Sequence, residues 1–148
     1  MKRSILAASI VLLLLGTCFS AHAKRDIEAK FFIEDALANP KIQQALRSEV
    51  SLYWGNQPVP ANSVQMQEIK TSKRSNGIGK EDIEACQWAF ASAIRALQDS
   101  ARRAGGNGLM NIQSNIDNIL SSSENQFDCA VGSVMVNVAF KATIIKTD

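Results

Sequence analysis

The residues of this chain whose type and spacing most clearly predict chemistry are two cysteines, Cys86 and Cys129. In an oxidising compartment such a pair forms a disulfide far more often than a metal site or a nucleophile. The bridge would close a loop of about 43 residues and stabilise the fold by about 4 kcal/mol on chain-entropy grounds. A redox role is the alternative, and it is disfavoured because the sequence has no Cys-x-x-Cys motif. We therefore predict a structural disulfide between Cys86 and Cys129.

The N-terminal sequence indicates that the chain reaches an oxidising compartment. Lys2 and Arg3 are basic, residues 5–15 are apolar apart from one serine, and residues 21–23 (Ala-His-Ala) supply the small residues that signal peptidase recognises. The apolar run is too short and too close to the N-terminus to be a transmembrane span. We predict that residues 1–23 are a signal peptide, cleaved between Ala23 and Lys24, and that the mature protein lies in the periplasm.

A lipoprotein is the alternative to the cleaved form. Residues 15–18 (Leu-Gly-Thr-Cys) loosely resemble a lipobox, in which Cys18 would carry the lipid. Threonine is larger than the residue expected before that cysteine, whereas residues 21–23 fit the cleavage pattern well. We therefore expect cleavage after Ala23 rather than lipidation.

The expected mature chain is short and has a balanced charge. Removing 23 residues from 148 leaves 125, enough for one α+β domain over residues 24–148. Two of the 16 Lys and Arg lie in the leader, which leaves 14 basic residues against 14 Asp and Glu. Without a basic surplus we expect no nucleic-acid partner. No later apolar run approaches membrane length, so we expect no membrane span in the mature chain.

Residues for catalysis are scarce after cleavage. His22, the only histidine, leaves with the signal, which excludes a Ser-His-Asp triad and a Cys-His dyad in the mature chain. Carboxylates remain, in the acidic pairs Glu34-Asp35 and Glu81-Asp82, but acidic residues are also typical of helix N-termini. Residues 77–80 superficially resemble a phosphate-binding loop and lack its full spacing. We expect no catalytic residue, no metal ligand and no cofactor.

Three aromatic residues, Trp88, Tyr53 and Trp54, are candidate contacts for a partner. Trp88 lies roughly opposite Phe90 on a predicted helix, away from its apolar stripe. Either a second layer of the fold, such as the N-terminal segment, covers Trp88, or the side chain is exposed and binds another protein. Tyr53 and Trp54, at the end of a predicted strand, leave the same two alternatives open.

The elements that must position these residues begin with a helix over residues 81–104. Apolar residues, including Cys86, recur there at steps of three and four and form one apolar face. The helix begins with acidic residues and ends with Arg102 and Arg103, as the helix dipole favours. The pair Gly105-Gly106 predicts a left-handed cap at its C-terminus.

Strands are predicted from apolar alternation over residues 50–54, 64–70, 109–113 and 131–145. Asn39-Pro40 is typical of a helix start, with Asn at the cap and Pro at the first helical position. Residues 24–30 are expected to be a charged lead-in, and residues 71–80 an exposed loop. The predicted fold class is α+β, with a mainly antiparallel sheet packed against one long helix.

The position of Cys129, just before the last predicted strand, raises a problem of parity. If the strand ran unbroken back to Cys129, that cysteine would face away from Val134 and lie out of reach of Cys86. A bulge or bend near Gly132 would restore the parity, because glycine permits one. We predict an irregularity between Cys129 and Ser133.

Several segments resemble a family of small exported bacterial proteins, many of which carry the name excinuclease ATPase subunit. They are residues 86–90 (Cys-Gln-Trp-Ala-Phe), 104–108 (Ala-Gly-Gly-Asn-Gly), and 127–129 with 131–133 (Phe-Asp-Cys and Val-Gly-Ser). The sequence has no Walker motif and no zinc-finger cysteines, so we do not expect ATPase or excinuclease activity. More remotely, the order of helix, Gly-Gly-Asn-Gly, strand, loop and Cys-x-x-Gly-Ser is similar to RcsF-like envelope-stress lipoproteins and YbjQ-like domains. This resemblance implies a sheet packed on a helix and a role in binding other envelope proteins.

We therefore expect an exported, non-enzymatic, disulfide-stabilised domain that binds another envelope component, and we expect that component to be a protein. The alternative is a carboxylate-based hydrolase acting on an envelope substrate, which requires two acidic side chains about 5–9 Å apart in a cleft. A ligand or metal carrier is a third possibility, and it would depend on carboxylates alone. The sequence does not predict the oligomeric state.

Overall fold

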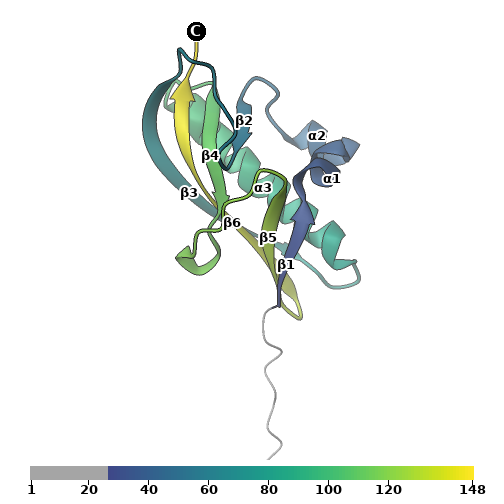
Figure 1. Cartoon of the computed structure of the whole chain (residues 1–148). Helices are drawn as coiled ribbons and strands as arrows, with labels where there is room; N and C mark the ends of the chain where they lie inside the picture. Colours follow the sequence, from purple (N-terminus) through teal and green to yellow (C-terminus); the bar gives the residue numbers. More distant parts are fainter. Residues whose placement is uncertain (1–26) are drawn as a thin grey trace, which may run out of the picture.

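A curled sheet of mixed strand direction packs with one face against a long helix (Figure 1). The computed structural model describes residues 27–148, so the predicted cleavage site at Ala23 and Lys24, and Cys18, lie outside the described residues. The strands are β1 (Ile27–Phe32), β2 (Ser51–Trp54), β3 (Val64–Asn76), β4 (Gly108–Ser114), β5 (Gln126–Val131) and β6 (Met135–Lys146). The helices are α1 (Ile33–Ala38), α2 (Pro40–Ala45) and α3 (Asp82–Arg103), with a short 3-10 turn, η1 (Ile116–Asn118).

The strand β6 organises the sheet. On one edge it pairs antiparallel with β3 along nearly its whole length. Its other edge is shared, because β5 pairs antiparallel with its first residues and β4 pairs antiparallel with its last ones. Beyond these, β1 pairs antiparallel with β5, and β2 pairs parallel with β4. The sheet therefore forks, and the predicted fold class is confirmed, with one parallel pair in a mainly antiparallel sheet.

The long helix agrees closely with its prediction, over Asp82–Arg103 instead of 81–104. Gly105 has a φ of +83°, and its amide donates to the carbonyl of Arg102. The amide of Gly106 donates to the carbonyl of Ala101 at 2.8 Å, which completes the predicted left-handed cap. At the start of α2, the Asn39 side chain accepts from the Lys41 amide, and Pro40 follows at the first helical position, as expected.

Two predicted loops are strands in the structure. The expected lead-in over residues 24–30 contributes to β1, which pairs with β5. The expected loop over residues 71–80 begins with strand, because β3 continues to Asn76. Both strands lie at edges of the sheet. The polar part of β3 lacks the apolar alternation on which the prediction relied. In β1 the apolar Ala29 and Phe31 do alternate with Glu28 and Lys30, and the prediction missed this short pattern among charged residues.

The irregularity predicted between Cys129 and Ser133 is a chain reversal instead of a bulge. The amide of Gly132 donates to the carbonyl of Met135 at 3.0 Å, which closes a turn across Ser133 and Val134. Residues 131–145 are thus not one strand, because β5 ends at Val131 and β6 begins at Met135. As a separate strand, β5 can direct Cys129 toward α3.

The core lies between α3 and the sheet. Four buried aromatic rings meet there, Trp54, Phe90, Phe127 and Phe140, with centroid separations between 4.7 and 6.5 Å among the contacting pairs. The predicted disulfide joins Cys86 to Cys129 with their Cα atoms 6.1 Å apart, and both residues are fully buried. It links α3 covalently to β5.

Candidate functional site

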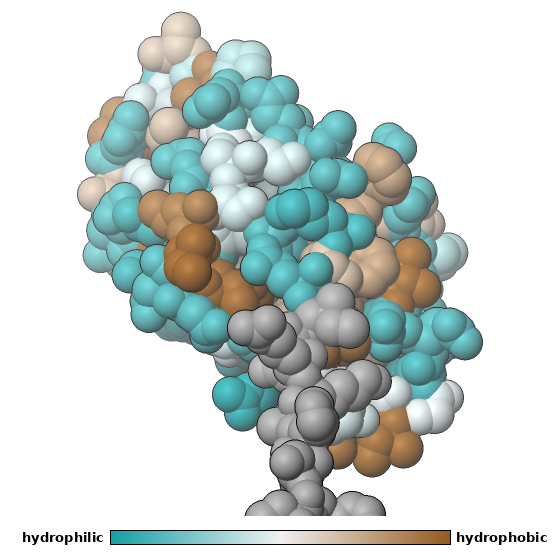
Figure 2. All heavy atoms as spheres, turned by 60° about the horizontal axis from the view of Figure 1, so that its bottom comes forward, coloured by the Kyte–Doolittle hydropathy of each residue, from teal (hydrophilic) through white to brown (hydrophobic). Residues whose placement is uncertain are grey.

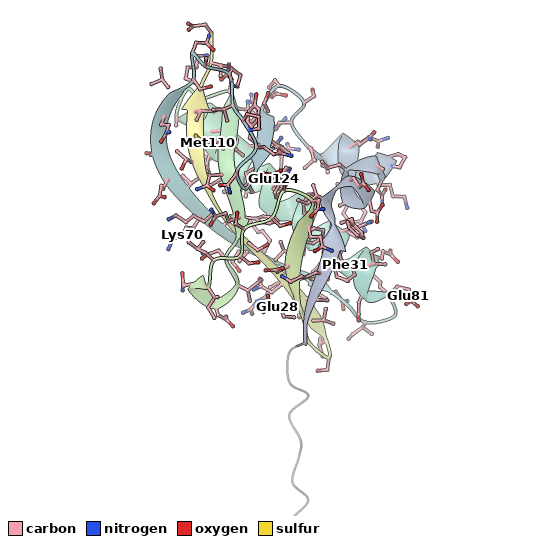
Figure 3. The ribbon with its side chains drawn as sticks, in the orientation of Figure 1. Glu28, Phe31, Lys70, Glu81, Met110 and Glu124 are labelled. Carbon is pink, nitrogen blue, oxygen red and sulfur yellow. A yellow bond between two sulfur atoms is a disulfide. The ribbon has the colours of Figure 1, made fainter. Side chains whose placement is uncertain are left out.

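The face of the sheet opposite α3 carries a polar depression, which we call the outer groove. It consists of two hollows of about 420 and 370 Å³ that share Arg74, Asp117 and Asn137 in their walls. The polar residues that line the outer groove are Glu28, Lys70, Thr71, Ser72, Arg74, Asn115, Asp117, Asn118, Ser133 and Asn137. Figure 3 shows Lys70 on β3 and Glu28 on β1, on opposite sides of this face.

Strand alternation places the groove residues on the outer face. In β6, Val136 and Val138 are buried in the core with their side chains toward α3, so Asn137 between them faces the other way. Its Oδ1 accepts a hydrogen bond of 2.8 Å from the Ser72 hydroxyl of β3. The same alternation directs Arg74, two residues further along β3, to the outer face.

The turn η1 fills the fork of the sheet and forms one wall of the groove. The Asn115 amide donates to the Ala139 carbonyl at 2.8 Å, at a point on β6 that neither β4 nor β5 covers. Asp117 and Asn118 then adopt φ of +51° and +64°, a left-handed conformation that Asp and Asn tolerate better than most residues. This backbone holds Asp117 beside Arg74 in the groove lining.

An ion pair with one buried member supports the same face. Asp128 on β5 is 3% exposed, and its carboxylate accepts a hydrogen bond of 2.5 Å from the Lys30 ammonium on β1. The amide of Asp128 donates to the Ser114 hydroxyl at 2.9 Å, which connects β5 to the end of β4. Because a buried carboxylate requires a partner, Lys30 fixes the position of β1, the strand that carries Glu28 into the groove.

A second depression, which we call the Trp54 pocket, lies between α1 and β2 and has a volume of about 380 Å³. Its apolar lining is Ile33, Leu37, Leu52 and Trp54. Two carboxylates, Glu34 and Glu124, also line it, and Figure 3 shows Glu124 in the segment that precedes β5. The sequence singled out Glu34 as half of an acidic pair but did not single out Glu124.

The three candidate aromatic contacts lie in different environments. Trp54 is 4% exposed and packs its ring in the core, so it is not available as an exposed contact. Tyr53 is half-buried. Trp88 is also half-buried, against the core, and the neighbouring Gln87 accepts from the Asn39 side chain at the start of α2. The N-terminal helices therefore contact α3 next to Trp88, and the exposed part of that side chain leaves both alternatives open.

The segment that resembled a phosphate-binding loop is engaged in local contacts. The Gly77 amide donates to the Val134 carbonyl at 2.9 Å, and the Lys80 ammonium donates to the Asn76 carbonyl. Exposed apolar side chains flank this junction, Ile78 and Ile83 on one segment and Val134 and Met135 on the other. Figure 2 looks toward this end of the molecule and shows its apolar side chains in patches separated by hydrophilic ones.

Among residues 27–148, no three His, Cys, Asp or Glu side chains are grouped so that they could hold a metal ion. The helices of that same part of the chain are too short or too polar to cross a membrane. Comparison of the chain with protein-family models, with curated proteins and with solved structures finds no match.

The outer groove was not predicted from the sequence because its residues come from distant segments. Glu28, Arg74, Asp117 and Asn137 belong to four different elements that only the folded sheet brings together. One local signal was available: residues 115–118 (Asn-Ile-Asp-Asn) concentrate the residue types that adopt left-handed backbone conformations.

Proposed function

We propose that this chain is an exported, non-enzymatic binding module that holds a polar segment of another envelope protein in the outer groove. The observation that carries this proposal is the groove itself, which presents both signs of charge together with amide side chains on a rigid sheet face. Each of its two hollows falls in the size range of ordinary ligand sites, about 300–1,000 Å³. Arg74 and Asp117 offer opposite charges within one wall, as suits a chain with alternating donors and acceptors.

The chemistry of the groove favours binding over catalysis. Ser72 donates its hydroxyl hydrogen to the amide oxygen of Asn137, and an amide cannot act as a general base. In this proposal the charged residues beside Ser72 and Asn137, which are Lys70, Arg74 and Asp117, orient a bound chain. Export to the periplasm rests on the signal-like residues 1–23, and the buried disulfide between Cys86 and Cys129 is of the kind that forms there.

Site-specific photo-crosslinking in the bacterial periplasm tests the proposal. A photoreactive side chain at Asn118, an exposed position in the groove, should give a discrete adduct with a second protein. The same side chain at Gln44, an exposed position on α2, should not give that adduct. Reversing the groove charge with Arg74→Glu should reduce the Asn118 adduct by about tenfold. Equal adducts from both positions, or none from Asn118, would show that the groove does not bind a protein.

The Trp54 pocket favours a second candidate function, a carboxylate-based hydrolase acting on an envelope glycan. Glu34 and Glu124 line one pocket, and a pair of carboxylates is the usual catalytic equipment of glycoside hydrolases. Incubation of the purified protein with peptidoglycan tests this candidate. Turnover that Glu34→Gln and Glu124→Gln each abolish, and that Glu28→Gln in the outer groove leaves unchanged, would support it. An intact glycan after long incubation would eliminate it.

A further inference from the structure

The strand β3 has one free edge. It is 13 residues long, and within residues 27–148 it pairs only with β6. The register with β6 is regular from Glu68 to Asn76, after an irregularity between Gln65 and Glu68. A long strand with an unpaired row of amides and carbonyls is a template for pairing with another strand.

The amides that face this free edge can be identified from the ladder. The Gly77 amide donates to the Val134 carbonyl, and antiparallel pairs alternate between bonded and non-bonded. Odd-numbered residues of β3 therefore bond to β6, and the even-numbered ones face outward. The other edge of β6 supports this assignment. The carbonyls that accept on that edge belong to the odd-numbered Met135, Ala139 and Ile145, so the even-numbered residues of β6 are the ones that bond to odd-numbered residues of β3. The outward residues of the regular stretch are thus Glu68, Lys70, Ser72, Arg74 and Asn76.

The charges on these outward residues select one register for self-pairing. If Thr71 lies on a two-fold axis, Glu68 of each copy is opposite Arg74 of the other, and Lys70 is opposite Ser72. A shift of two residues in one direction sets Lys70 opposite Arg74, and a shift in the other sets Lys70 opposite Lys70. Larger shifts toward the start of the strand run into the irregularity before Glu68. Like charges directly opposite each other destabilise a strand pair, so the register centred on Thr71 is favoured over both of its neighbours. A shift of four residues toward the end of the strand brings no like charges together, but it loses both Glu68–Arg74 pairs.

We propose that two copies of this chain form a dimer by antiparallel pairing of their β3 strands, with the two-fold axis at Thr71. Four outward residues of one copy pair with four of the other, and each pair exchanges two backbone hydrogen bonds. On the outer face, Glu68 of each copy lies opposite Arg74 of the other, and it contacts the Lys141 ammonium of its own chain at 2.8 Å.

The dimer would present both outer grooves on one continuous face. Residues with even numbers lie on the outer face of β3 in both copies, because the register pairs even positions with even positions. The helices α3 would both lie on the opposite face. The proposal concerns the edge of β3 and stands whether or not the outer groove binds a protein.

The mass of the purified mature chain in solution tests the dimer. We expect twice the mass of one chain by light scattering at high micromolar concentration. Glu68→Arg should weaken the dimer by about tenfold or more, and Arg74→Glu should do the same, because each sets like charges opposite each other. The double variant Glu68→Arg/Arg74→Glu restores opposite charges and should restore the dimer. A monomer at high concentration, or charge variants that dimerise as well as the original, would overturn the proposal.

A backbone variant makes the test independent of side-chain charge. Lys70→Pro removes an outward amide and leaves the β6 ladder intact, so it should give a folded monomer. Lys70→Thr, which keeps that amide, should remain dimeric. Circular dichroism and the urea midpoint establish that each variant is folded. A folded Lys70→Pro variant that still dimerises would place the contact elsewhere and refute the β3 pairing.

Discussion

The side chain of Gln98 and the backbone of Arg47 hydrogen-bond to each other twice. The Gln98 amide nitrogen donates to the Arg47 carbonyl at 2.8 Å, and the Arg47 amide donates to Gln98 Oε1 at 2.8 Å. Gln98 lies on α3 and is 1% exposed, and it also donates to the Val50 carbonyl at 3.3 Å. This buried glutamine satisfies the backbone of the loop that leads into β2, the strand that carries Trp54 into the core.

Replacement of this glutamine should destabilise the fold strongly. Gln98→Leu has a similar volume but removes the partner of the Arg47 amide and of the Val50 carbonyl, and it leaves the Arg47 carbonyl with the Val50 amide alone. We expect the free energy of unfolding, measured in urea, to fall by about 1–3 kcal/mol. Gln44→Leu on the exposed side of α2 should change it by less than about 0.5 kcal/mol. Equal effects of the two variants would mean that the Gln98 hydrogen bonds contribute nothing net.

The disulfide between α3 and β5 should contribute a large part of the stability. It closes a loop with a sequence separation of 43 residues, and the chain-entropy argument predicts a contribution of about 4 kcal/mol. We expect reductant to lower the urea midpoint of the purified protein accordingly. The variant Cys86→Ala/Cys129→Ala should already have the lower midpoint and should not respond to reductant. A midpoint that reductant leaves unchanged in the original protein would contradict the prediction.

Asp99 should make stability depend on pH in the acidic range. The hydrogen bond from Arg47 lowers the pKa of this carboxyl below its ordinary value of 3.8, helped by the charges of Arg47 and Arg95 and opposed by partial burial. The folded state therefore binds the proton less readily than the unfolded state. The resulting stabilisation is present above about pH 4 and is lost as the pH falls through the lowered value.

The measurement is the difference in free energy of unfolding between the original protein and Asp99→Asn, followed as the pH is lowered. It should be below about 1 kcal/mol at neutral pH, because the carboxylate is partly exposed, and it should shrink in acid. In an Arg47→Leu background the difference should be smaller at every pH. A difference that grows in acid would contradict a lowered pKa for Asp99 in the folded state.

The two glycines that end α3 should respond differently to substitution. Gly105 has a positive φ and open space around it, so Gly105→Ala should cost about 1 kcal/mol through the backbone alone. A Cβ at Gly106 would lie 2.9 Å from the Ile145 carbonyl oxygen and against the Ile144 side chain. Gly106→Ala should therefore cost more, about 3 kcal/mol, through steric strain.

Asparagine variants at the two positions distinguish backbone strain from steric clash when stability is measured by thermal or urea unfolding. Gly105→Asn should be milder than Gly105→Ala, because Asn adopts the left-handed conformation more readily. Gly106→Asn should be at least as damaging as Gly106→Ala, since the clash involves the Cβ atom. If Asn rescued stability at Gly106 as well, the steric explanation would fail.

The features that could be predicted from the sequence are those with local signals. The periodicity of residues 81–104, the pair Gly105-Gly106 and the sequence Asn39-Pro40 each depend on near neighbours, and the structure has all three. The cysteine pair was predictable by elimination, because only two cysteines remain once a signal peptide is removed.

The remaining features depend on contacts between distant segments. β1 is a strand because β5 lies beside it, and the polar part of β3 is a strand because β6 supplies its hydrogen bonds. The outer groove combines both of these strands with η1. A prediction that takes either strand for a loop therefore cannot locate the site. Nothing near Glu124 in the sequence indicates that it lines a pocket with Glu34.

The pairing of β1 with β5 has a consequence for the order of events during biosynthesis. Lys30 and Asp128, which join these strands, are 98 residues apart in the sequence. A chain that emerges from its N-terminus cannot complete the sheet until its last fifth is available, and such distant pairings are slow to form. β1 therefore stays unpaired until β5 has been synthesised, and β5 joins the sheet only through β6. Slow folding of this kind is compatible with the export proposed above, because a translocation channel passes an unfolded chain.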